Sequence, residues 1–181
     1  MAREVHVSRE VEIPEGVSVE VEGLRVKVKG PKGEILKDFS HARGVNIRVE
    51  GNRVIIESFF PRARQIALVG SLASHIRNMI VGVTRGFRYK LKIIYVHYPI
   101  SVKVEKGRVV ISNFLGEKSL RAVEVPSGVR VTVSGQDVIV EGIDIESVSQ
   151  TAARIEEVTR VRDKDRRKFM DGIYIYAREV A

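Results

Sequence analysis

The chain has 181 residues, of which 44% are hydrophobic and 30% are charged, and its formal net charge at pH 7 is +8. This apolar content is sufficient for one large domain or two small ones, which excludes a disordered protein. The absence of cysteine excludes disulfides, thiolate nucleophiles and cysteine-ligated zinc, and favours a reducing, cytoplasmic location. The positive charge favours a polyanionic partner.

The first half of the chain is predicted to form strands and hairpins followed by a helix. Apolar residues alternate with polar ones over 5–13, 17–28 and 45–56, and glycine-containing turns interrupt the alternation. Beyond Pro61, which suits the first turn of a helix, the apolar period changes to about three and a half. We expect an amphipathic helix packed on a sheet, with Gly82 as its C-terminal cap.

The second half of the chain repeats this pattern. The apolar positions of 45–57 recur 84 residues later, and those of the hairpin at 19–34 recur 83 residues later. A second helix follows, with Asp144 as its N-cap. Before the second copy, a strand predicted over 87–95 carries cations on one face, and we expect it to fix the two copies against each other.

These patterns predict an α+β fold made of two tandem duplicated units, each an antiparallel sheet packed against one helix. The first unit is expected to span residues 1–82. The second unit, with the main basic loop, is expected to span residues 83–181. The order of strands and then a helix, twice, argues against a parallel βαβ sheet.

A dense run of basic residues follows the second helix. Six cations and two aspartates fall within nine residues, at Arg160, Arg162, Asp163, Lys164, Asp165, Arg166, Arg167 and Lys168. The last three cations are expected to be exposed, whereas Phe169 and Ile173 are expected to be buried. The dipeptide Asp171-Gly172 predicts a turn into a final strand at 173–176. The plain alternative is a solvated loop whose charge only aids solubility.

The sequence gives no support for catalysis. The four histidines, His6, His41, His75 and His97, are far apart and lack a metal-ligand spacing. No nucleophile elbow or nucleotide-binding phosphate loop is present. The G-P-K-G stretch at 30–33 matches the G-x-x-G loop of KH domains, but it follows a strand, so a hairpin turn is the better interpretation. We expect no enzyme activity and no metal or other cofactor.

Three stretches together resemble a known family. They read N-M-I-V-G-V-T-R-G-F-R-Y-K from Asn78, N-F-L-G-E-K from Asn113 and R-K-F-M-D-G-I-Y-I from Arg167. The combination resembles the sixth protein of the large ribosomal subunit, in the archaeal and eukaryotic branch of the family, over essentially the whole chain. The resemblance implies a structural protein that binds large-subunit rRNA near the factor-binding region at the base of the stalk. It also implies neighbouring ribosomal proteins as partners, with no small-molecule substrate and no membrane.

The resemblance further implies that the turn at 113–118 and the loop at 160–172 face rRNA. Together with nearby cations, the predicted rRNA-binding residues are Asn113, Gly116, Lys118, Arg121, Arg154, Arg160, Arg162, Lys164, Arg166, Arg167, Lys168 and Gly172. Arginine suits phosphate groups through its planar fork of donors, and A-form RNA is expected to be recognised by shape and backbone.

One alternative of a different class stays open. The chain could be a protein-interaction module that uses exposed strand edges and the basic loop to bind an acidic partner. An anionic membrane surface is a weaker option, because no amphipathic apolar face flanks the basic run.

Overall fold

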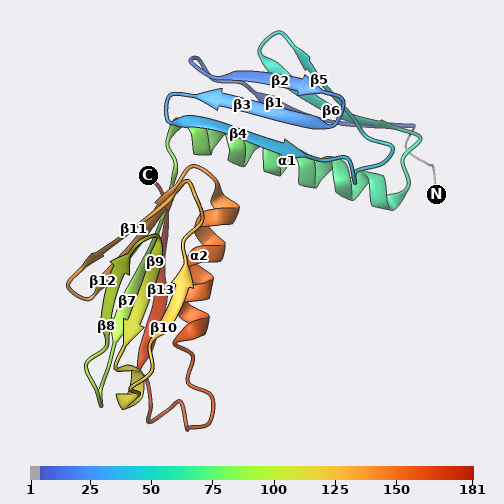
Figure 1. The fold of residues 1–181 in the computed structure, drawn as a ribbon. Helices are drawn as coiled ribbons and strands as arrows, with labels where there is room; N and C mark the ends of the chain where they lie inside the picture. Colours follow the sequence, from blue (N-terminus) through green and yellow to red (C-terminus); the bar gives the residue numbers. More distant parts are fainter. Residues whose placement is uncertain (1–4) are drawn as a thin grey trace. The chain divides into compact units, whose positions relative to one another are not determined.

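Each half of the chain folds into two small antiparallel sheets and one helix (Figure 1). The computed structural model describes residues 5–181, and the chain divides into two units between Arg85 and Gly86. The predicted α+β class and the tandem duplication are confirmed, and the structure adds a second sheet to each unit.

The first unit contains six strands and α1 among its described residues. One sheet has the order β2-β3-β4 and the other has the order β1-β6-β5, with every pair antiparallel. The elements are β1 (His6–Glu12), β2 (Ser18–Glu22), β3 (Arg25–Gly30), β4 (Gly33–Asp38), β5 (Asn46–Glu50), β6 (Arg53–Phe59) and α1 (Ala63–Thr84).

The second unit contains seven strands, one 3-10 turn (η1) and α2. Its sheets have the orders β10-β9-β8 and β11-β12-β7-β13, again antiparallel throughout. The elements are β7 (Phe87–Ile94), β8 (Ser101–Glu105), β9 (Arg108–Ser112), η1 (Phe114–Gly116), β10 (Arg121–Glu124), β11 (Val129–Ser134), β12 (Asp137–Gly142), α2 (Ile145–Val158) and β13 (Gly172–Val180).

The two units share one strand arrangement. The β2-β3-β4 sheet corresponds to β8-β9-β10, and the β1-β6-β5 sheet corresponds to β7-β12-β11. The strand expected to fix the two copies against each other is therefore part of the second unit, where β7 takes the place that β1 has in the first. The strands β4 and β10 were not predicted, because their apolar residues are adjacent pairs, Ile35-Leu36 and Ala122-Val123, and do not alternate with polar ones. β13 has no counterpart among the described residues of the first unit.

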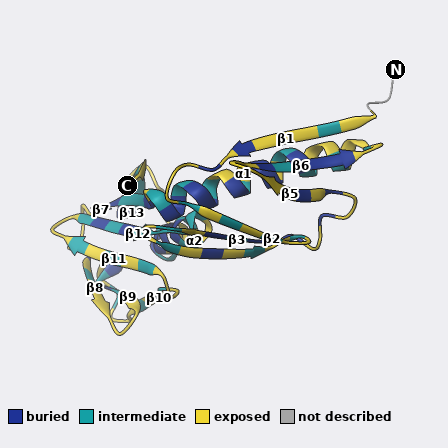
Figure 2. Ribbon diagram, turned by 90° about the horizontal axis from the view of Figure 1, so that it is seen from above, coloured by how far each residue is buried: buried dark blue, intermediate teal, exposed yellow. Residues whose placement is uncertain are grey.

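The apolar side of α1 forms a large part of the core of the first unit. The helix packs against β1, β3, β4 and β6, and it carries buried residues on one side and exposed residues on the other (Figure 2). By length and composition alone α1 would also qualify as a membrane span, but its apolar side lies in the core of the unit. The expectation that Gly82 caps the helix is wrong, because Gly82 is buried within it. The helix continues to Thr84, so the units divide between residues 85 and 86 instead of 82 and 83.

The second helix begins as predicted at the Asp144 cap. The Asp144 carboxylate accepts hydrogen bonds from the backbone N–H groups of Glu146 (3.4 Å) and Ser147 (3.2 Å), which have no partner inside the helix. The apolar side of α2 packs against β7, β10, β12 and β13. This packing fixes the point at which the chain leaves α2 and enters the basic run.

Two glycines of the first unit test the packing of β3 on α1. A Cβ added at Gly30 would lie 2.7 Å from Val83 Cγ2 and 3.0 Å from the Val83 carbonyl oxygen, whereas a Cβ at Gly70 meets nothing within 4 Å. Gly30→Ala should therefore lower the free energy of unfolding by about 1–3 kcal/mol through overpacking. Gly70→Ala should raise it by about 1 kcal/mol, because alanine favours a helix interior. Urea unfolding followed by circular dichroism measures both values, and equal effects would contradict the close approach of β3 to α1.

Candidate nucleic-acid interface

The cations predicted to bind RNA lie in an exposed loop between α2 and β13. We call residues 159–171 the basic loop. All six of its cationic side chains are exposed, namely Arg160, Arg162, Lys164, Arg166, Arg167 and Lys168. Within residues 5–181, none of these six forms an ion pair with a carboxylate. Their donors are therefore available to an external anion.

Asp165 shapes the outer part of the basic loop. Its carboxylate accepts a hydrogen bond from the backbone N–H of Arg167 (3.0 Å). Its carbonyl oxygen accepts from the N–H groups of Lys168 (3.0 Å) and Phe169 (2.9 Å). These bonds close a tight turn and satisfy backbone donors that would otherwise depend on water. One of the two acidic residues in the run thus helps to present the neighbouring cations.

The basic loop is held at its start by Thr159 and Val161, which are both buried. The Thr159 hydroxyl donates to the carbonyl oxygens of Ile155 and Glu156, at 3.2 Å each, and accepts from the N–H of Ile173 at 3.0 Å. A single hydroxyl therefore ties the end of α2 to the beginning of β13. This places the two ends of the loop side by side.

Asp171 holds the far end of the loop from a fully buried position. Its Oδ1 accepts from the backbone N–H groups of Val96 (2.9 Å) and His97 (3.1 Å), and its Oδ2 accepts from Nδ1 of His97 (2.9 Å). Burial by itself raises the pKa of the carboxyl group, but these hydrogen bonds outweigh it, so the pKa of Asp171 lies below its ordinary 3.8. The Asp171-Gly172 dipeptide is thus a buried anchor followed by a strand, and the predicted turn is wrong.

Phe169 joins the anchor to the cations. Its ring stacks on His97, with 4.5 Å between ring centroids, and Lys164 Nζ lies 4.7 Å from the centroid of the same ring. The ring is only half-buried, so the expected burial of Phe169 is wrong, whereas Ile173 is buried as predicted. A cation over an aromatic face is attracted by the ring quadrupole, which holds Lys164 in place without neutralising it.

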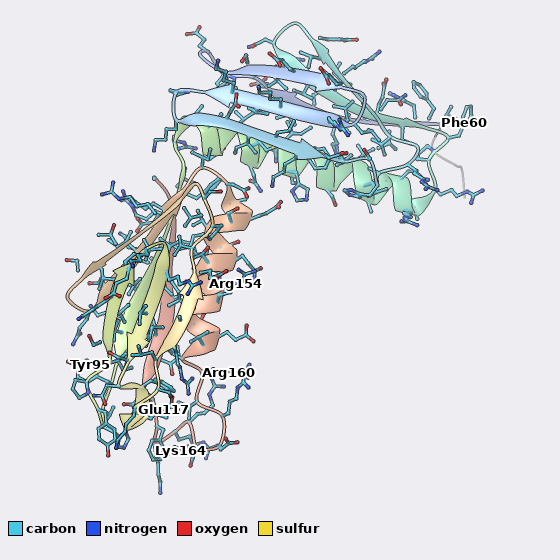
Figure 3. All side chains as sticks on the ribbon, in the orientation of Figure 1. Phe60, Tyr95, Glu117, Arg154, Arg160 and Lys164 are labelled. Atoms are coloured by element: carbon cyan, nitrogen blue, oxygen red, sulfur yellow. The ribbon has the colours of Figure 1, made fainter. Side chains whose placement is uncertain are left out.

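A second predicted segment, the turn at 113–118, lies at the same end of the unit. Figure 3 shows Glu117 of this turn close to the part of the view that holds Arg160 and Lys164. The two segments line one depression of about 430 Å³. Its lining includes Phe114 and Leu115 of the turn and Arg160, Arg162 and Lys164 of the basic loop. The structure thus brings the two segments together along one concave surface.

Three predicted residues have other positions or partners. Arg121 binds Glu117 through Nε (3.0 Å) and Nη2 (2.6 Å), donates to the Val158 carbonyl oxygen, and lies over the Phe114 ring at 4.4 Å. Its guanidinium thus links the turn to the end of α2. Gly172 is buried as the first residue of β13. Arg154 is exposed on α2, outside the basic loop (Figure 3).

The cations of β7 differ from those of the basic loop. The three cations of β7 each face a carboxylate on a neighbouring strand: Arg88 pairs with Glu141, Lys90 with Glu179 (2.8 Å) and Lys92 with Asp137 (3.3 Å). Cross-strand pairs of opposite charge stabilise a sheet and reduce the net charge of its surface. The charge of β7 is therefore compensated locally, whereas that of the loop is not.

The sequence pointed to the cations but missed the segment that supports them. The residues Tyr95, Val96, His97 and Tyr98 follow β7, and all four are exposed. Two tyrosines and a histidine in four positions after a strand are a local signal for an aromatic surface, but their position beside the basic loop depends on Asp171.

For metals, the part of the chain that the structure describes contains no group of three or more His, Asp or Glu side chains able to hold an ion.

The comparisons with known proteins agree with this arrangement of two similar units. The sequence model described as "Ribosomal protein L6" matches residues 13–86 and again residues 98–172, once in each unit. The chain belongs to the ribosomal protein L6 family. It is 67% identical to the "Large ribosomal subunit protein uL6" of Aeropyrum pernix over 99% of both chains. It is 64% identical to the protein of the same name from Desulfurococcus amylolyticus, and 50% identical to that from Saccharolobus solfataricus, over 97% of each chain.

Membership of the L6 family identifies the chain as a structural constituent of the large ribosomal subunit. The resemblance found in the sequence to the archaeal and eukaryotic branch is thereby confirmed, because the relatives compared are archaeal. The family is one of ribosomal structural proteins and not of enzymes, which agrees with the expectation of no catalytic activity.

The charge of Asp171 should set the acid stability of the second unit. A carboxyl group whose pKa is lowered on folding stabilises the fold fully above its ordinary pKa of 3.8, and this contribution is lost as the pH falls through the lowered value. Asp171→Asn should lower the free energy of unfolding by about 1.5–3 kcal/mol at neutral pH, as expected for a hydrogen-bonded buried charge. The difference in the free energy of unfolding between the variant and the wild-type chain should shrink as the pH falls below 3.8. Urea titrations at a series of pH values measure it, and a difference that grows on acidification would contradict the assignment.

Proposed function

We propose that the chain binds large-subunit rRNA through the basic loop and the adjoining turn at 113–118. One observation carries the proposal: the six cations of the loop are exposed and unpaired within the described chain, although the three cations of β7 in the same unit are each paired with a carboxylate. Six unpaired cations gathered in one loop, beside a strand whose cations are paired, fit a polyanion better than they fit water alone. Membership of a ribosomal protein family supports rRNA as that polyanion.

The binding should be dominated by phosphate contacts. Arginine presents donors in a planar fork that matches two phosphate oxygens, and four of the six loop cations are arginines. The concave surface between the loop and the turn lets cations approach a backbone from two sides. Because an A-form helix hides its base edges in a deep and narrow major groove, such contacts select the shape of the RNA and not its sequence.

The resemblance to the family supports a finer location. It implies a site near the factor-binding region at the base of the stalk, with neighbouring ribosomal proteins in contact with the chain, on ribosomes in the cytoplasm. In this arrangement the hydrogen-bonded ends of the loop hold its cations in register, and the two-sheet frame provides the rigid support.

Replacing Arg166, Arg167 and Lys168 together by glutamine tests the proposed contact. Each phosphate contact contributes about −0.7 to −0.9 to the slope of log K against log salt, so the slope should become shallower by about 2–3. The matched control replaces Lys103, Lys106 and Arg130, three exposed cations of the same unit, which changes the net charge equally. Filter binding to Aeropyrum pernix large-subunit rRNA at several salt concentrations provides the slopes, and thermal melts provide the stabilities.

The triple glutamine variant should melt within a few degrees of the wild type, because exposed substitutions change stability by only about 0.5 kcal/mol each. An equal loss of slope in the control would show that net charge alone governs binding. A variant that melts much earlier yet binds rRNA as before would show that the loop is structural. In either case the assigned site would be wrong.

A further inference from the structure

The aromatic segment after β7 is the strongest feature that phosphate binding leaves unexplained. Tyr98 is 50% exposed and Tyr95 is 40% exposed. Figure 3 shows Tyr95 at the same end of the second unit as Glu117 and Lys164. Tyrosine is enriched at binding interfaces, because its ring supplies apolar contact area while its hydroxyl stays hydrogen-bonded.

The ring of Tyr98 is supported from one side by the backbone of the turn at 113–118. A Cβ added at Gly116 would meet three carbons at the phenol end of the ring at 3.3–3.4 Å, and the hydroxyl oxygen is not among the nearest atoms. The glycine therefore faces the plane of the ring. The φ of Gly116 is +77°, a conformation that other residues rarely adopt. Asn113 fixes the turn at this place by donating from Nδ2 to the Pro99 carbonyl oxygen, 3.0 Å away.

The residues that precede Tyr98 in the chain are also held in place. The backbone N–H groups of Val96 and His97 are bound by the buried carboxylate of Asp171, and the His97 ring is stacked on Phe169 of the basic loop. Tyr98 thus stands between a turn and a clamped segment, with one ring face toward Gly116 and half of its surface open. It is a fixed aromatic surface beside a run of unpaired cations.

We propose that Tyr98 is a stacking surface for an unpaired nucleobase of the rRNA. This inference rests on the proposed function and extends it, because phosphate contacts alone do not require an aromatic ring. Charge complementarity decides the occupant: the exposed cations of the adjoining basic loop and turn attract the phosphates that flank a base, whereas an apolar protein surface would gain nothing from them. Bases in single-stranded loops and bulges stack on aromatic side chains, and cationic grooves alongside hold their backbone.

The test compares Tyr98→Leu and Tyr98→Phe, with Tyr176→Leu as a matched control. Tyr176 is 56% exposed on β13 of the same unit. The probe is the Aeropyrum pernix large-subunit rRNA, measured by filter binding over a range of salt. Tyr98→Leu should weaken binding about 5- to 140-fold, because stacking of one base contributes that much. The salt slope should not change, since no charge is lost. Tyr98→Phe keeps the ring and should retain most of the affinity, and Tyr176→Leu should bind like the wild type.

A second readout does not depend on a loss of affinity. The chain contains no tryptophan, so Tyr98→Trp and Tyr176→Trp each introduce a single indole fluorophore. The rRNA should quench the emission of the Tyr98→Trp variant strongly and that of the control weakly.

The outcomes separate this inference from the proposed function. If the triple glutamine variant loses affinity while Tyr98→Leu does not, the stacking surface is refuted and the basic loop stands. Equal weakening by leucine and phenylalanine, or equal quenching of both tryptophan variants, would also overturn the stacking surface. Failure of the wild-type chain to bind the rRNA would overturn both proposals.

Discussion

A single buried carboxylate joins the segments that make up the candidate RNA surface. Asp171 accepts hydrogen bonds from two backbone N–H groups about 75 residues earlier in the chain and from the His97 ring. Leaving a charge of this kind unpaired in the interior would cost several kcal/mol, so the end of β7 and the start of β13 must stay together. The basic loop leaves from this point. Six like charges in nine residues can therefore be held in a defined arrangement before any RNA is bound.

The duplication explains how the chain acquires a separate contact surface. Both units share one strand arrangement, but α1 is followed almost directly by β7, whereas α2 is followed by the basic loop and then by β13. The loop therefore occupies a place that has no counterpart in the first unit. The cations of β7 are paired, as Arg88 is with Glu141, whereas the six cations of the added loop are not. In the proposed function, stability and rRNA binding thus depend on different side chains of the same unit.

Local patterns were sufficient to predict much of the fold, but not the support of the site. The hairpins, both helices and the duplication follow from apolar spacing and turn residues, whereas the apolar residues of β4 and β10 are adjacent pairs that show no alternation. The exposed cations of the basic loop were predicted from charge density. Asp171 was mistaken for a turn residue, because its partners are remote in sequence and no local pattern records them. The ion pair of Arg121 with Glu117 was also missed, because the two residues lie at the end of a turn and the start of a strand, where an i, i+4 spacing is no signal for a contact.

The central claim is that rRNA covers the basic loop in the assembled large subunit. Lysine acetylation followed by mass spectrometry measures this directly, on intact subunits that contain the chain and on the free protein. We expect Lys164 and Lys168 to react quickly in the free protein, to be protected in the subunit, and to react again after digestion of the RNA. Lys103 and Lys106, which are exposed on the hairpin of β8 and β9, should change less. Fast acetylation of Lys164 and Lys168 in the intact subunit would contradict the account.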